Sequence, residues 1–102
     1  MPTPQEVWAL LQAHEGETFY TAKGLPFHYQ VHGGELFVNR KSKSITISTV
    51  ANALQRIQKQ EDAGERITGP KKIGGYGASY LYPVFLQLGI LRLPQDDQLH
   101  FL

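Results

Sequence analysis

The stretch PFHYQVHGGELFVN, residues 26–39, decides the fold class, because it predicts a β-hairpin. Apolar and polar side chains alternate on both sides of the glycine pair, and a period of two places the apolar ones on one face of a strand. Gly33-Gly34 is a strong signal for the tight turn between the strands. The alternating apolar residues are Phe27, Tyr29, Val31, Leu36 and Val38.

Upstream of the hairpin, the chain predicts a helix and then a strand. Thr3 suits the N-cap, Pro4 the first helical position, and Glu6 stands three residues after Thr3, which makes a capping box. Apolar side chains then follow at helical spacing until Gly16, which predicts the end of the helix. The period changes to two from residue 17, which predicts a strand.

Downstream, Ile45 and Ile47 predict a short strand, and residues 48–60 predict an amphipathic helix that Ser48 or Thr49 caps. Gln55, Arg56, Gln58 and Lys59 belong to its polar side. Residues 64–78 contain six glycine or proline residues and predict a long connection without regular structure, which is often functional or mobile.

A third helix is expected from Ser79 to Leu88, and Pro83 must then lie in its first turn to avoid breaking it. Residues 91–102 predict a C-terminal hairpin around a Pro-Gln-Asp-Asp turn. The predicted fold class is therefore α+β: an N-terminal helix, a small antiparallel sheet with hairpins, two further helices and a C-terminal hairpin. A length of 102 residues predicts one domain, 1–102.

Composition excludes several kinds of chemistry. The chain has no cysteine, so it has no disulfide, no thiolate nucleophile and no cysteine zinc site. The same absence favours a cytoplasmic location. We see no targeting segment and no apolar run of about 18 residues that would span a membrane, so we expect no membrane partner.

The net charge of +1 conceals an uneven distribution along the chain. Residues 36–77 carry eight basic and three acidic side chains, a net +5, whereas residues 1–35 carry a net −3 and residues 78–102 a net −1. Such asymmetry can direct a molecule towards a polyanion when the total charge cannot. Nucleic acid is therefore the leading expected partner.

The first candidate site is the glycine-rich segment that leads into the third helix. Glycines let a backbone approach a phosphate closely, and helix N-termini attract anions. Lysine adds charge, serine a hydroxyl, and tyrosine a ring that stacks on bases. The residues predicted to bind here are Lys71, Lys72, Gly75, Tyr76 and Ser79. The alternative is a flexible loop with turn glycines, since neither a nucleotide P-loop nor a dinucleotide fingerprint is present.

The second candidate site is the basic loop with the helix that follows it. Arg40, Lys41 and Lys43 are expected to meet phosphates, and Ser48 and Thr49 to contact phosphates or base edges. Asn52, Arg56 and Lys59 on the same helix are further residues of these types. An ordinary capped amphipathic helix is the alternative, and the connector to the next helix is much longer than a helix-turn-helix motif uses.

Other functions have less support in the sequence. We predict no cofactor, no metal site and no catalytic residue, since the four histidines lack a zinc spacing and no nucleophile motif is present. The rival hypothesis is a protein-interaction or homodimerisation module that uses an aromatic sheet face. A third hypothesis is a small anion-binding enzyme that uses the glycine-rich loop. The leading interpretation is a non-enzymatic nucleic-acid-binding or regulatory module.

Overall fold

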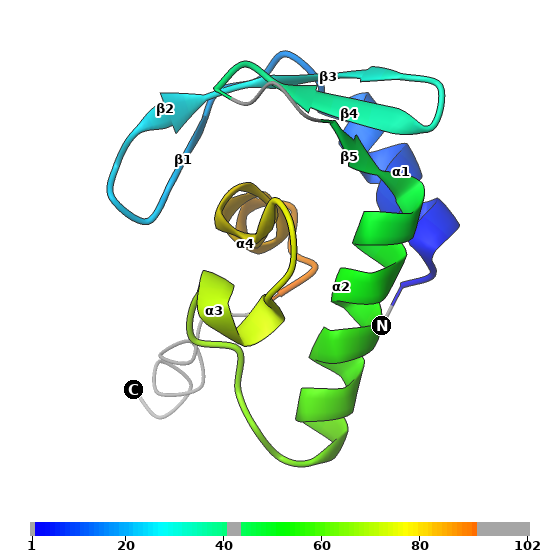
Figure 1. Cartoon of the computed structure of the whole chain (residues 1–102), viewed down its shortest axis with the longest axis vertical. Helices are drawn as coiled ribbons and strands as arrows, with labels where there is room; N and C mark the ends of the chain where they lie inside the picture. Colours follow the sequence, from blue (N-terminus) through cyan, green and yellow to red (C-terminus); the bar gives the residue numbers. More distant parts are fainter. Residues whose placement is uncertain (1, 41–43, 92–102) are drawn as a thin grey trace.

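The computed structural model describes residues 2–40 and 44–91, which form four helices and five short strands (Figure 1). In chain order they are α1 (Pro4–Ala13), β1 (Phe19–Tyr20), β2 (Pro26–Phe27), β3 (Tyr29–His32), β4 (Glu35–Val38), β5 (Ile45–Thr46), α2 (Ile47–Asp62), α3 (Pro70–Ile73) and α4 (Ala78–Gln87). Helices combine with small antiparallel sheets, so the α+β class is confirmed.

The strands form two sheets. β3, β4 and β5 make a three-stranded antiparallel sheet, and the predicted hairpin is its β3–β4 pair, with Val31 opposite Leu36 and His32 opposite Glu35. The predicted range of 26–39 is too long, because Pro26–Phe27 forms β2 and pairs with β1 instead. The chain changes partner at His28, whose backbone N–H donates to Asn39 Oδ1 at 2.9 Å.

The capping box of α1 is confirmed. Thr3 Oγ1 accepts a hydrogen bond from the Glu6 N–H at 3.1 Å, and Glu6 Oε1 accepts one from the Thr3 N–H at 2.9 Å. The hydrogen bond from the Thr3 N–H, and then the Thr3 hydroxyl, lower the pKa of the Glu6 carboxyl. The helix ends at Ala13, and Gly16 follows with a φ of +85°, a left-handed conformation that favours glycine. Trp8 Nε1 donates to the Gly33 carbonyl at 3.4 Å and so connects α1 to the hairpin turn.

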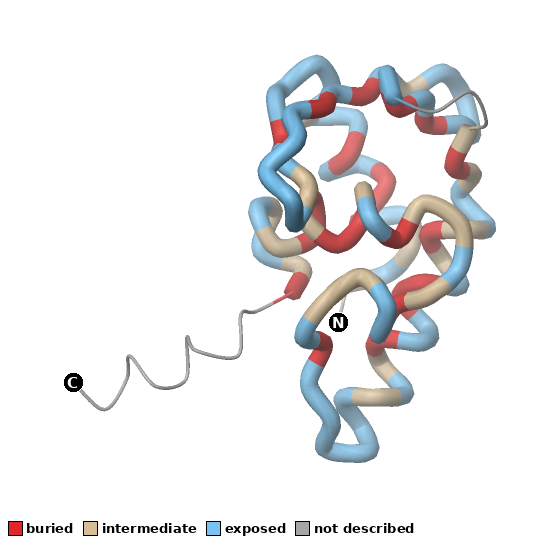
Figure 2. Tube along the Cα trace, turned by 60° about the vertical axis from the view of Figure 1, so that its left-hand side comes forward, coloured by how far each residue is buried: buried red, intermediate tan, exposed pale blue. Residues whose placement is uncertain are grey.

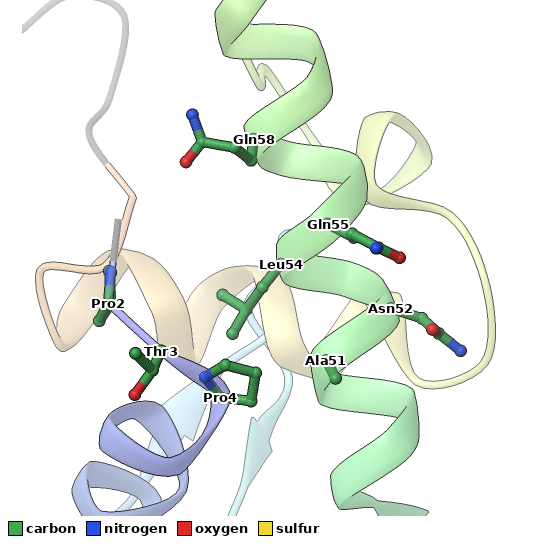
Figure 3. A pocket seen from close by; sticks show the side chains of 8 residues that line it. All are labelled: Pro2, Thr3, Pro4, Ala51, Asn52, Leu54, Gln55 and Gln58. Atoms are coloured by element: carbon green, nitrogen blue, oxygen red, sulfur yellow. The ribbon is translucent and has the colours of Figure 1, made fainter.

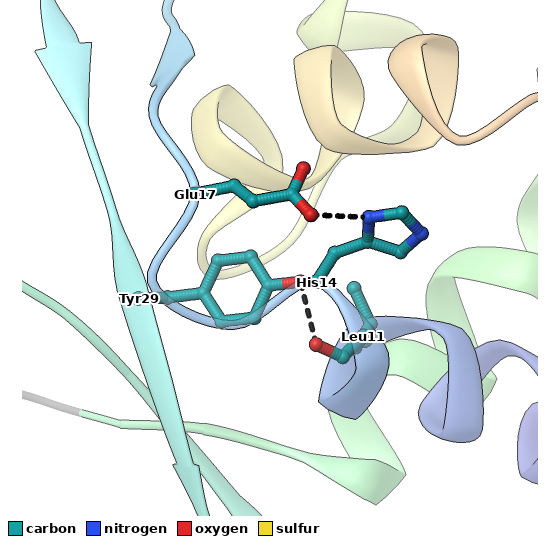
Figure 4. A network of polar contacts seen from close by, with 4 residues as sticks. All are labelled: Leu11, His14, Glu17 and Tyr29. Carbon is teal, nitrogen blue, oxygen red and sulfur yellow. Dashed lines mark hydrogen bonds and ion pairs between the residues drawn. The ribbon is translucent and has the colours of Figure 1, made fainter.

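Polar contacts also fix the C-terminal end of α1 against β3 (Figure 4). The buried Tyr29 hydroxyl donates to the Leu11 carbonyl at 2.7 Å, and the Gly16 N–H donates to the Tyr29 carbonyl at 2.9 Å. Burial first, and then the nearby carboxylates of Glu17 and Glu15, raise the pKa of the Tyr29 hydroxyl. His14 Nδ1 and Glu17 Oε2 lie 2.7 Å apart at the surface beside this contact.

Helix α2 begins earlier than the sequence predicts. Thr46 is the N-cap, in an extended conformation, and its Oγ1 accepts a hydrogen bond from the Thr49 N–H at 3.2 Å. The prediction of Ser48 or Thr49 as the cap was wrong, because the chain enters the helix directly from β5 and Thr46 is the last extended residue. The helix ends at Asp62, close to the predicted end.

The segment predicted to lack regular structure contains the short helix α3. Pro70 supplies the fixed φ of a first helical position, and the Gly74 N–H donates to its carbonyl at 3.0 Å. Helix α4 is close to the predicted 79–88, but Pro83 lies in its second turn rather than its first. Proline has no N–H to donate to the Ser79 carbonyl, so α4 lacks this one intrahelical hydrogen bond.

The core lies between the sheets and the helices. Figure 2 shows the buried residues along the inner sides of these elements. Along β4, Leu36 and Val38 are buried while Glu35 and Phe37 are exposed, so one face of this sheet packs on the core. α4 lies centrally, with α2 along one side of the molecule (Figure 1). Among the described residues no charged side chain is buried, and the buried Tyr29 hydroxyl has its hydrogen-bond partner.

The predicted C-terminal hairpin falls almost entirely on residues outside the described ones, which end at Leu91. Of the helices in residues 2–40 and 44–91, none is both long enough and apolar enough to cross a bilayer.

Candidate nucleic-acid interface

Helix α2 exposes a polar stripe along its length. Ser48, Asn52, Gln55 and Lys59 follow one another at steps of four, three and four residues, which places them on one line of the helix surface, and all four are exposed. None of their side chains has a hydrogen bond to another described residue. The opposite side of the helix is apolar and buried, through Val50, Ala53, Leu54 and Ile57. We call the four exposed residues the α2 stripe.

The stripe contains no acidic side chain. The first acids in α2 are Glu61 and Asp62, at its C-terminal end, and Gln58 Nε2 donates to Asp62 Oδ1 at 2.8 Å. A groove of about 520 Å³ lies between α2 and the start of α1. Figure 3 shows Asn52 and Gln55 projecting from α2 on the side away from Pro2 and Pro4, at the rim of this groove.

Two hydrogen bonds connect α2 to the C-terminal end of α3, one at Lys72 and one at the C-cap Gly74. Gln60 Nε2 donates to the Lys72 carbonyl at 2.5 Å, and Arg56 Nη1 donates to the Gly74 carbonyl at 3.5 Å. The carbonyls at the end of a short helix lack intrahelical partners, and side chains of α2 supply them. Lys71 and Lys72 are exposed and are held beside α2 in this way. Residues 56 and 72, distant in sequence, therefore belong to one region of the surface.

Packing accounts for the glycines of the glycine-rich loop. A Cβ at Gly75 would lie 2.7 Å from Arg56 Nη1, and one at Gly77 would lie 2.5 Å from Ile45 Cδ1. Both glycines have a positive φ, +79° and +76°. Tyr76 between them is half-buried and packs on the core. At Gly77 the loop approaches the buried Ile45 of β5 too closely for a Cβ, whereas at Gly75 the neighbour is the mobile end of the exposed Arg56 side chain.

Ser79 belongs to α4 and has no part in the hydrogen bonds between α2 and the end of α3. It is exposed in the first turn of α4 and helps to line a cavity of about 290 Å³ under the β1–β2 turn. Lys23 and Pro70 contribute to the same cavity. Its further lining residue Tyr80 is half-buried, with its ring edge-on to Phe27 at a centroid distance of 5.0 Å.

The residues predicted around the basic loop do not form one group. Arg40 is exposed, and its Nε donates to the Pro26 carbonyl at 2.7 Å, which holds it at β2 rather than beside α3. Lys41 and Lys43 lie outside the described residues. Thr49 is half-buried, and its Oγ1 lies 3.2 Å from Thr46 Oγ1 in the cap of α2. Of this group, Ser48 alone belongs to the α2 stripe.

From the sequence, Gln55 is expected on the polar side of the helix but not among the residues that contact a nucleic acid. The spacing of residues 48, 52, 55 and 59 is the signal that finds it, once the first residue of the helix is known. Arg56 is also more than a polar helix residue, since its guanidinium group reaches across to Gly74 and Gly75.

The aromatic residues of the sheets are mostly core. Phe19, Phe27 and Tyr29 are buried, with the rings of Phe19 and Tyr29 stacked at a centroid distance of 5.6 Å. Tyr20 and Phe37 are exposed by 58% and 39%. The described residues contain no group of three or more histidine, aspartate or glutamate side chains that could hold a metal ion.

Comparison of the chain with models of protein families, with curated protein sequences and with solved structures found no significant match.

Proposed function

We propose that this chain is a non-enzymatic nucleic-acid-binding module. Its binding surface consists of the α2 stripe together with Arg56 and the lysine pair of α3, and we call it the α2–α3 surface. One observation carries the proposal: seven exposed amide, hydroxyl and cationic side chains lie on two adjoining helices, with no acid among residues 44–60. They are Ser48, Asn52, Gln55, Arg56, Lys59, Lys71 and Lys72.

The chemistry of this surface suits a polyanion. Lysine and arginine contact phosphate oxygens and release bound counterions, and serine, asparagine and glutamine form the neutral hydrogen bonds that position a protein on a nucleic acid. The cationic side chains lie in the C-terminal half of α2 and on α3, while the neutral polar side chains extend towards the N-terminus of α2. Arg40 is not part of this surface, because it is held at β2.

The test is a fluorescence anisotropy titration with labelled duplex DNA, single-stranded DNA and RNA at several salt concentrations. We expect binding that weakens steeply with salt. The double variant Lys71→Ala plus Lys72→Ala should bind more weakly, and the slope of log K against log salt on duplex DNA should fall by about 2, since each phosphate contact contributes about 0.9.

Arg40→Ala is the control, because it removes a positive charge outside the α2–α3 surface. It should leave the salt slope nearly unchanged. Equal changes for Arg40→Ala and for each single lysine variant would show that only net charge matters and would refute the proposed surface. Absence of binding to all three nucleic acids at low salt would refute the function itself.

A further inference from the structure

We infer that α2 is a sequence-reading helix and that the ligand of the α2–α3 surface is duplex DNA, contacted in its major groove. This inference rests on the proposed function and assigns separate roles within the same surface. The α2 stripe supplies the contacts to base edges, and Lys71 and Lys72 supply contacts to the phosphate backbone beside the groove.

The dimensions of the stripe match those of the groove. From Ser48 to Lys59 the helix rises about 16 Å at 1.5 Å per residue, and this length corresponds to about five base pairs. A helix with its side chains is about 10–12 Å wide, and the major groove of B-DNA is about 12 Å wide. Figure 1 shows α2 along one side of the molecule, with α3 and α4 on its inner side and α1 beside its N-terminal half. The four residues of the stripe are exposed.

The residue types of the stripe suit base edges. Asparagine and glutamine pair with the two major-groove groups of adenine, and serine contacts any of several groups. Asn52 and Gln55 lie at the centre of the stripe, with neither side chain engaged elsewhere among the described residues. Arg56 stands at the border with α3, where its guanidinium group contacts the Gly74 carbonyl. A phosphate contact at this border is the role that suits it.

The same features argue against other nucleic acids. Side chains cannot read the deep, narrow major groove of A-form RNA, so the amide side chains of the α2 stripe could not contact base edges there. Single-strand binders stack bases on aromatic rings. The α2–α3 surface has no aromatic residue, and the exposed rings of Tyr20 and Phe37 lie on the strands.

The experiment selects bound sequences from a pool of duplexes with a randomised centre. It uses the complete chain, the variant Asn52→Ala plus Gln55→Ala, and the control variant Gln12→Ala plus Gln87→Ala. The control removes two exposed amides from α1 and α4. All four substituted side chains are exposed, so both variants should fold, and melting curves check this.

We expect the complete chain and the control variant to enrich one motif of about five base pairs. The Asn52→Ala plus Gln55→Ala variant should still bind duplex DNA with the same salt slope, but should discriminate the motif from random DNA at least about fivefold less well. Binding to duplex DNA without an enriched motif, or the same motif with the double variant, would overturn the inference and leave the proposed function intact. A preference for RNA or single strands would do the same. Absence of any binding would overturn both.

Discussion

Gly77 connects the glycine-rich loop to α4, and its replacement by alanine tests the packing that positions the loop. A Cβ at this position would lie 2.5 Å from Ile45 Cδ1 and 2.9 Å from Ile45 Cγ1, and Ile45 is buried. Two costs add. The left-handed φ of +76° costs an alanine about 1 kcal/mol, and pushing a methyl group into a packed core costs about 1–3 kcal/mol more. Gly77→Ala should therefore lower the free energy of unfolding by about 2–4 kcal/mol.

Gly24→Ala separates the two costs. Gly24 has a similar φ of +83°, but a Cβ there would meet nothing within 4 Å, so this variant should lose only the backbone cost of about 1 kcal/mol. Urea unfolding followed by circular dichroism measures both variants. The midpoint of Gly77→Ala should lie about 1 M below that of Gly24→Ala, taking a slope of about 1–3 kcal/mol per molar. Equal midpoints would refute the close approach of the loop to Ile45.

Two further predictions concern the ends of α1 and α2. The pKa of Tyr29 is raised from an ordinary value of 10.0, so the native state keeps a proton that the unfolded chain releases above this pH, and stability should fall as the pH rises beyond 10. Tyr29→Phe should make this alkaline decline shallower, and Tyr82, whose pKa burial also raises, should keep part of it. Near pH 7 the same substitution should lower the free energy of unfolding by about 1–3 kcal/mol, because the Leu11 carbonyl loses its donor. An unchanged decline in pH-dependent urea titrations would contradict this prediction. Thr46→Ala should cost about 1 kcal/mol as the loss of an N-cap, and Ser48→Ala less than about 0.5 kcal/mol; thermal melts that rank the two variants in the opposite order would move the cap to Ser48.

Local signals with a complete mechanism could be predicted from the sequence. The Thr3–Glu6 capping box needs only residues three apart, and the Gly33-Gly34 turn needs only its neighbours to alternate. Each of these features satisfies its hydrogen bonds or buries its apolar face within one short segment. Tertiary packing does not decide them, so the residue types are sufficient.

Features that depend on contacts between distant segments could not be predicted in this way. The change of strand partner at His28 depends on a hydrogen bond to Asn39. The short helix α3 could not be predicted from the glycine-rich segment, because a side chain of α2 supplies a hydrogen bond at the end of α3. The glycines of the loop resemble a phosphate cradle in sequence, whereas their close neighbours in space are Arg56 and Ile45. The basic segment is similar: its net charge is visible in the sequence, but the separation of Arg40 from Lys72 is a property of the fold.

The composition of α2 also argues for a binding role. A solvent-exposed helix gains stability from acids in its first turn and from Glu and Lys pairs four residues apart, but residues 47–60 contain no acid and include Ser48 and Asn52, which are weak helix formers. Such departures from the rules of stability are expected at functional sites. Asn52→Glu tests this argument, because it places an acid four residues before Arg56 and should raise stability by about 0.5 kcal/mol.

In a chain of this size that gain corresponds to a rise of about 2–4 °C in Tm. The same substitution introduces a negative charge at the centre of the α2 stripe, so duplex binding should weaken while the melting temperature rises. Gln12→Glu on α1, an exposed control, adds the same charge away from the surface and should leave binding nearly unchanged. Higher stability with unaltered binding would mean that the stripe faces only water, and lower stability would mean that Asn52 makes a structural contact.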